Sequence, residues 1–276
     1  MNNIITVGSS KVWLKTKYDY GMKMDIPHSD NIAHALYGFN QLGAEVVPYH
    51  TIKEIYYKVG KNDIVLDYID QCKVIFDKFD VQPKLDDYPD CMKEFLHRKI
   101  WTDTINSISS NKEKWTAGWF VKPVRGKAFT GKIISSIHDL VGCGNHSENY
   151  DVLCSEAIDI KAEWRCFIYK DEIIDIRPYG QLIDADRQSW KYSYDPKVVE
   201  AMLKRFKTWD ERPAACSMDI AVAYTPESKD ILQTVLIEFN DCYALGNYGL
   251  PSLFYAKMIS ARWSQLLGRE DEYDFE

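Results

Sequence analysis

Apolar positions in the first 90 residues alternate between strand-like and helix-like spacing. Ile4–Val7 and residues 44–49 have the β-branched and aromatic composition of short strands. Between them, apolar residues recur at helical spacing over residues 30–42, and Gly43 suits the left-handed conformation that ends many helices. A further strand is predicted at residues 64–66. Because this order is typical of a βαβ unit, we predict a small α/β domain over residues 1–90.

The remaining chain, residues 91–276, is predicted to form a second domain that is richer in strands. A polar break with closely spaced aspartates occupies residues 83–89. A helix is expected from about Asp90, with an apolar side that extends to Ile108. A last amphipathic helix is predicted at residues 253–267. The strands predicted between these two helices are residues 118–123, 133–137, 152–155, 163–169, 173–178, 216–224 and 231–240.

Composition and charge narrow the classes of function. The 276 residues carry a formal charge of −7, which disfavours nonspecific binding to nucleic acid, because that affinity comes from Lys and Arg. No apolar run reaches the length of a membrane helix, and the first residues lack a basic, apolar secretory signal. We therefore expect a cytoplasmic protein without membrane or nucleic-acid partners.

The cysteines and histidines predict no catalytic or metal centre. Seven cysteines are spread singly along the chain without a CxxC motif, as is typical of reduced thiols. Cys143 and His146 lie three apart, but no second ligand pair follows at zinc spacing.

A basic, glycine-containing stretch follows the strand at residues 118–123. Lys122 ends this strand, and Lys127 and Lys132 follow in a segment that contains two glycines. Glycines let backbone N–H groups approach an anion, and lysines neutralise phosphates. The order of residues is not that of a P-loop. Taken alone, the stretch is equally typical of a solvated basic hairpin.

Two arginines are predicted to face each other in the next pair of strands. If residues 170–172 form a three-residue turn, Arg165 lies directly opposite Arg177. Like charges in this position are destabilising unless an anion or a carboxylate such as Glu163 or Glu238 lies between them. The alternatives are two solvated arginines on an exposed face, or a register slip that removes the pairing.

Acidic and amide side chains gather at the hairpin predicted from residues 216–224 and 231–240. Glu238 and Asn240 are two apart and share a face, and the predicted register places Asp219 near Leu236, diagonal to Glu238. Carboxylate and amide oxygens suit Mg²⁺, which shares its shell with nucleotide phosphates. The alternative is a set of polar residues that meet solvent at the strand ends. We favour a magnesium site, since apolar strands rarely place acids so close without a counter-charge.

The order of these three features resembles that of the ATP-grasp superfamily, and more closely a clade of ATP-grasp domains found in bacteria and their phages. The stretches that carry the resemblance are Tyr88-Pro89, Phe95-Leu96-His97-Arg98, Phe120-Val121-Lys122-Pro123, Lys127-Ala128-Phe129-Thr130-Gly131, Glu238-Phe239-Asn240-Asp241 and Asn247-Tyr248-Gly249-Leu250. The resemblance implies an α/β to α+β fold in which two α+β subdomains clasp ATP, preceded by a small Rossmann-like domain.

The resemblance also implies roles for individual residues. The nucleotide-binding set consists of Arg98, Lys122, Lys127 or its rival Lys132, the hinge Glu156-Ala157-Ile158 for adenine, and Glu163 for ribose. Asp219, Glu238 and Asn240 match the magnesium ligands, and Arg165 and Arg177 match cations near the transferred phosphoryl group and the substrate carboxylate. Ser217 is a departure, since peptide-forming members often carry an arginine there.

The implied activity is that of an ATP- and Mg²⁺-dependent, ADP-forming carboxylate–amine ligase that works through an acylphosphate. Its substrates are a carboxylate and an amine, each in a small molecule, a peptide or a protein side chain. Substrate selectivity is expected in the first 90 residues and in residues 179–209. The alternatives are a noncatalytic ATP-binding or protein-interaction module, and an ATP-dependent phosphotransferase.

Overall fold

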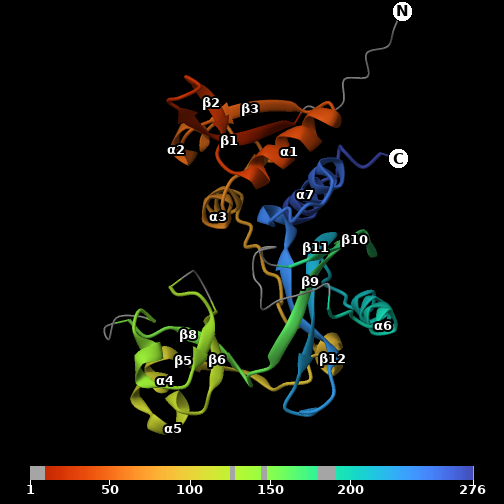
Figure 1. The fold of residues 1–276 in the computed structure, drawn as a ribbon. Coiled ribbons are helices and arrows are strands. Elements are labelled where there is room, and N and C mark those ends of the chain that lie inside the picture. The colour runs from red at the N-terminus through yellow and green to blue at the C-terminus, as the bar shows by residue number, and fades with distance from the viewer. Residues whose placement is uncertain (1–9, 125–127, 144–147, 180–190, 276) are drawn as a thin grey trace, which may run out of the picture.

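The structure, a computed structural model, describes residues 10–124, 128–143, 148–179 and 191–275 (Figure 1). Its described strands form three four-stranded sheets, one near each end of the view and one in the middle. No helix in these ranges is long and apolar enough to cross a membrane.

The first unit, which comprises β1–β4 and α1–α3, is built around its first strand. β1 pairs in parallel with β3 and β4 and antiparallel with β2. The elements of this unit are β1 (Lys11–Asp19), β2 (Met24–Pro27), α1 (Asp30–Gln41), β3 (Glu45–Tyr49), α2 (Ile52–Ile55), β4 (Ile64–Leu66) and α3 (Ile69–Lys78). The predicted strand at Ile4–Val7 lies outside the described residues. The sequence patterns did not predict β1.

The predicted helix of the first unit is confirmed with its end signals. The Ser29 hydroxyl accepts a hydrogen bond from the backbone N–H of Ile32 and caps α1. Gly43 has a φ of 75°, the left-handed conformation expected after the helix. β3 and β4 also lie at the predicted positions.

The last helix, α7 (Ser252–Leu267), completes the core of the first unit (Figure 1). Its Trp263 ring stacks on Phe76 of α3 at 4.2 Å between ring centroids. It also packs closely on α1, because a Cβ added to Gly38 would lie 2.0 Å from the carbonyl oxygen of Ser252. The short η3 (Cys242–Ala244) leads toward this helix. The division of the chain at residue 90 stays a prediction, as does the Rossmann-like character of its first part.

The second sheet has the order β5-β8-β6-β7, with all neighbours antiparallel. Its elements are β5 (Ile100–Thr104), α4 (Ile105–Ser110), α5 (Lys112–Trp115), β6 (Trp119–Pro123), β7 (Lys132–Ile134), η2 (Ile137–Leu140) and β8 (Asp151–Ser155). The predicted continuous helix from Asp90 to Ile108 is wrong. The chain instead forms η1 (Asp90–Phe95), turns at His97 with a φ of 48°, and enters β5, which pairs with β8.

The third sheet has the order β10-β9-β11-β12, also antiparallel. Its strands and the helix that covers it are β9 (Asp159–Tyr169), β10 (Glu172–Pro178), α6 (Pro196–Phe206), β11 (Ala215–Tyr224) and β12 (Gln233–Asp241).

The predicted pairing of Arg165 with Arg177 is confirmed, but it arises differently from the prediction. The turn has two residues, Lys170 and Asp171, both with positive φ, and a bulge between Ile173 and Asp175 restores the register.

A second bulge changes the predicted register of the β11–β12 hairpin. Asp219 lies directly opposite Glu238, whereas Ile220 lies opposite Leu236, so Ile237 is the extra residue. The two carboxylates are therefore direct neighbours across the strands, closer than the diagonal placement predicted from alternation.

Candidate functional site

A cavity of about 500 Å³ lies between the sheet of β5–β8 and the sheet of β9–β12. This volume suits a small-molecule ligand. Apolar side chains such as Phe120, Ile133 and Ile160 line part of the wall. The predicted site residues that line it are Arg98, Lys132, Glu156, Ala157, Ile158, Glu163 and Glu238. Residues predicted from separate parts of the sequence thus meet at one cavity.

The segment that follows β8 forms the hinge side of this inter-sheet cavity. Glu156 accepts a hydrogen bond from the backbone N–H of Lys99 at 2.8 Å, and its own N–H donates to the Lys99 carbonyl at 3.1 Å. These two bonds fix Glu156 against the start of β5. Ala157 and Ile158 follow and line the cavity. Glu163 is buried on β9 with 6% of its surface exposed.

Arg98 binds the bulge of β12. Its guanidinium donates to the carbonyl oxygens of Leu96, Leu236 and Ile237 at 3.0, 2.7 and 2.9 Å. Burial lowers the pKa of Arg98, while Tyr88 and Glu238 oppose this effect. Arg98 therefore joins the start of β5 to the strand that carries Glu238, while it also lines the cavity.

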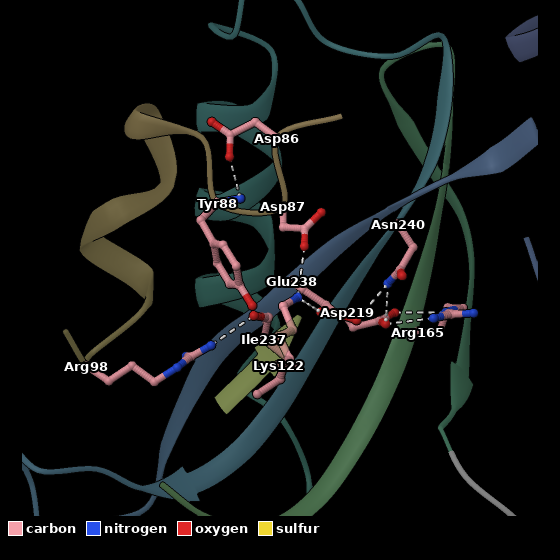
Figure 2. A network of polar contacts seen from close by, with 10 residues as sticks. All are labelled: Asp86, Asp87, Tyr88, Arg98, Lys122, Arg165, Asp219, Ile237, Glu238 and Asn240. Carbon is pink, nitrogen blue, oxygen red and sulfur yellow. Dashed lines mark hydrogen bonds and ion pairs between the residues drawn. The ribbon is translucent and has the colours of Figure 1, made fainter. Parts of the chain in front are cut away.

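Lys122 is held by two carboxylates and a ring (Figure 2). Its Nζ lies 2.8 Å from Asp87 Oδ2 and 2.7 Å from Glu238 Oε2, and 5.0 Å from the centre of the Tyr88 ring. Burial alone would lower the pKa of Lys122, but Glu238, Tyr88 and Asp87 raise it above its ordinary value. The amine therefore remains charged at neutral pH.

Asp87 and Tyr88 were not predicted as site residues. They lie in the polar segment between α3 and η1, for which the sequence gives no periodicity. The available signal was the group of aspartates in that segment, which indicated a loop and not a contact with Lys122.

A buried ion pair lies next to Glu238. Arg165 Nε and Nη2 donate to the two carboxylate oxygens of Asp219 at 2.8 and 2.7 Å, and both side chains are almost fully buried (Figure 2). Asn240 Nδ2 donates to Asp219 Oδ2 at 2.8 Å and to Glu238 Oε1 at 3.3 Å. The Arg165 guanidinium also lies 4.8 and 4.5 Å from the ring centres of Tyr179 and Tyr248.

The chemistry of Asp219, Glu238 and Asn240 fits a magnesium ion. Two neighbouring carboxylates here depend on cations, which Arg165 and Lys122 now supply. A carboxylate oxygen has more than one lone pair, so the bonds from Arg165 leave Asp219 further acceptor capacity. Among the described residues, however, no group of three His, Cys, Asp or Glu side chains is already arranged around a metal position.

The remaining predicted cations lie elsewhere. Arg177 is half-exposed and pairs with Asp175 at 2.6 Å, and it is not among the residues that line the inter-sheet cavity. Lys132 lines that cavity and donates to the carbonyl of Val141 at 3.2 Å. Lys127 lies outside the described residues. Like the other site residues, Arg177 and Lys127 stay predictions.

A second cavity, of about 760 Å³, lies between the first unit and the sheet of β9–β12. Asp30 and Asn31, at the start of α1, form one side, and Arg165 and Asn240 form the other. Tyr179 lines both cavities, so the two meet at this residue. The second cavity is also lined by Tyr248, whose backbone is in the left-handed region with a φ of 48°.

The chain was compared with known proteins. A family model described as an ATP-grasp domain, the second family of its clade, matches residues 95–258. A search of curated proteins found no match.

Solved structures of three enzymes are similar in fold. D-alanine–D-alanine ligase from Bacillus anthracis in complex with ATP is 11% identical, with a TM-score of 0.50 over 94% of this chain and 98% of that one. N5-carboxyaminoimidazole synthetase from Staphylococcus aureus is 10% identical, with a TM-score of 0.50 over 95% and 78%. N5-carboxyaminoimidazole ribonucleotide synthetase from Thermotoga maritima is 11% identical, with a TM-score of 0.52 over 91% and 74%.

Proposed function

Since the chain belongs to this clade family of ATP-grasp domains and has the ATP-grasp fold, we propose that it is an ADP-forming carboxylate–amine ligase. One observation carries the proposal. The inter-sheet cavity collects the predicted nucleotide-binding residues, and it meets a second cavity at Tyr179. One cavity would hold ATP and the other the groups to be joined.

ATP would lie in the inter-sheet cavity. Adenine would lie against the hinge of Glu156, Ala157 and Ile158, with apolar contacts from the facing sheet. Glu163 would bind the ribose hydroxyls, and Lys122 would bind the phosphates. Lys122 is suited to this role because its environment keeps it charged and holds its stem in place. Arg98, Lys132 and Lys127 complete the proposed nucleotide-binding set.

Asp219, Glu238 and Asn240 would hold Mg²⁺, which when bound neutralises phosphate charge. The protein's own part is to keep these oxygens together. Asn240 joins the two carboxylates by hydrogen bonds, and Arg165 fixes Asp219. Lys122 restrains Glu238 from the opposite side.

The substrate carboxylate would enter the second cavity beside Arg165. A carboxylate oxygen attacks the γ-phosphorus of ATP, the bond to the β-phosphate bridging oxygen breaks, and ADP leaves. The amine then attacks the carbonyl carbon of the acylphosphate, phosphate leaves, and the nitrogen loses a proton to solvent. Arg165 would stabilise the charge that develops on the phosphoryl oxygens, because it is charged, nearly buried and held in one orientation. Arg177 would need to turn away from Asp175 to assist.

A noncatalytic ATP-binding module is the second candidate. It is favoured by Ser217, which is fully buried opposite Asn240 and supplies no cation there. Release of ADP that requires both a carboxylate and an amine separates a ligase from this module and from a phosphotransferase.

Thermal unfolding with and without Mg-ATP tests the nucleotide site. A ligand that binds only the folded state at 100 times its Kd stabilises a protein by about 2.7 kcal/mol, which corresponds to a midpoint shift of roughly 5–10 °C at this size. We expect this shift in the wild type and its loss in Glu238→Gln. Glu211→Gln, which changes an exposed carboxylate, is the matched control and should keep it. Absence of a shift with both ATP and GTP would refute the proposal.

A further inference from the structure

The segment that joins the first unit to η1 is bound along β12. The backbone N–H of Phe239 donates to the carbonyl oxygen of Asp87 at 3.1 Å. Asp86 accepts a hydrogen bond from the backbone N–H of Tyr88 at 2.9 Å and is itself exposed. The backbone thus presents the Asp87 side chain to Lys122, while Tyr88 lines the inter-sheet cavity (Figure 2).

The Lys122 amine has little donor capacity left for a nucleotide. An ammonium group has three N–H donors. Two of its contacts are carboxylates, Asp87 at 2.8 Å and Glu238 at 2.7 Å, and the Tyr88 ring covers a further side. Only 18% of the Lys122 side chain is exposed. A phosphate oxygen can therefore approach this amine closely only if a present partner moves away.

Asp87 is the partner that can leave. Glu238 is fixed in the β12 ladder, directly opposite Asp219. Asp87 lies outside regular structure, and 42% of its side chain is exposed. Burial also raises the pKa of the Asp87 carboxyl against the effect of Lys122, and the nearby Glu238 raises it further. The charged form of Asp87 is thus held in an unfavourable setting by one lysine.

We propose that Asp87 occupies the position on Lys122 that a nucleotide phosphate oxygen takes, and that it thereby sets the affinity for ATP. The inference rests on the proposed function. ATP must displace the Asp87 carboxylate, which frees the segment at residues 82–89. Because this segment joins the first unit to the nucleotide site, its release links occupancy of that site to the connection between the two.

Calorimetric titration of ATP into Asp87→Asn and Asp86→Asn tests this competition. Both variants remove one negative charge from the same segment, but only Asp87 contacts Lys122. We expect Asp87→Asn to lower the Kd for ATP by roughly tenfold, both with Mg²⁺ and with EDTA, because the displaced charge is gone. Asp86→Asn should change the Kd by no more than about twofold, because its exposed charge is screened.

Three results would overturn the inference. An unchanged Kd in Asp87→Asn would show that the carboxylate does not compete. A weaker affinity that appears only with Mg²⁺ would make Asp87 a metal ligand instead. If the wild type fails to bind ATP, the proposed function falls together with the inference, whereas the first two results leave that function intact.

Hydrogen exchange of the wild type provides a test that needs no variant. Amides of residues 82–89 should exchange faster when ATP is bound, while those around the inter-sheet cavity exchange more slowly. Uniform slowing that includes residues 82–89 would contradict the displacement of Asp87.

Discussion

Replacement of Arg165 by methionine tests how strongly the buried ion pair organises the site. Methionine keeps much of the apolar stem of the side chain and removes the guanidinium. The Asp219 carboxylate, which is 1% exposed, would then be left without its two strongest donors. Loss of one partner from a buried ion pair costs about 3–5 kcal/mol, because the remaining charge stays buried and uncompensated.

The surrounding contacts place the expected value near the lower end of this range. Asn240 still donates to Asp219 at 2.8 Å, which offsets about 1 kcal/mol. We expect the free energy of unfolding to fall by about 3 kcal/mol in Arg165→Met. In the double variant Arg165→Met/Asp219→Asn the buried charge is gone, so its loss should be smaller than the sum of the two single losses by about 2 kcal/mol.

The dependence on pH identifies the charge that causes the loss. Burial raises the pKa of Asp219, whereas Arg165 opposes this, so the single variant should have an Asp219 pKa well above the unfolded value. A carboxyl with a raised folded-state pKa is least costly below its unfolded pKa, and its cost grows as pH rises through the folded pKa. The deficit of Arg165→Met should therefore be larger at pH 8 than at pH 4.5, and that of the double variant should not.

Urea unfolding of the three variants at both pH values measures these differences. A loss below 1 kcal/mol in Arg165→Met at pH 8, or an equal loss at both pH values, would refute the reasoning.

Two further predictions concern the framework around the site. Gly38→Ala should lower the free energy of unfolding by about 2–3 kcal/mol, since the new Cβ meets the Ser252 carbonyl, whereas Gly60→Ala has room; equal losses in urea would contradict this. Asp171→Asn should cost about 0.5–1 kcal/mol at pH 7. The bond from Arg212 lowers the pKa of Asp171, so this contribution is present above the ordinary carboxyl pKa and is lost as pH falls through the lowered one; thermal melts at pH 7 and pH 3 should therefore differ in the effect of the variant.

Local patterns in the sequence predicted the elements that carry the site. Alternation located β9 and β10 and placed Arg165 opposite Arg177, because the side chains of a strand have a fixed period of two. The glycine after α1 predicted the end of that helix for the same kind of local, steric reason. The group of residues that line the inter-sheet cavity was reached through the family resemblance, which orders the features along the chain.

The rest depended on features that periodicity does not encode. A bulge adds one residue to a strand without a sequence signal, so the direct pairing of Asp219 with Glu238 was missed. The apolar positions after Asp90 fit a helix as well as they fit a 3₁₀ turn followed by β5, and pairing with β8 decides between them. The contact between Asp87 and Lys122 joins an irregular segment to a distant strand, which only the folded chain brings together.

The packing of α7 against α1 and α3 has a consequence for the order of folding during synthesis. The first unit leaves the ribosome early, but part of its core, including Trp263, is made near the end of translation. Until then the apolar faces of α1 and α3 lack their cover, and closing this contact spans most of the chain, which slows it. The earliest segment to be synthesised should thus be the last to reach its native packing, and a nascent chain stalled before residue 252 should depend on chaperones to stay soluble.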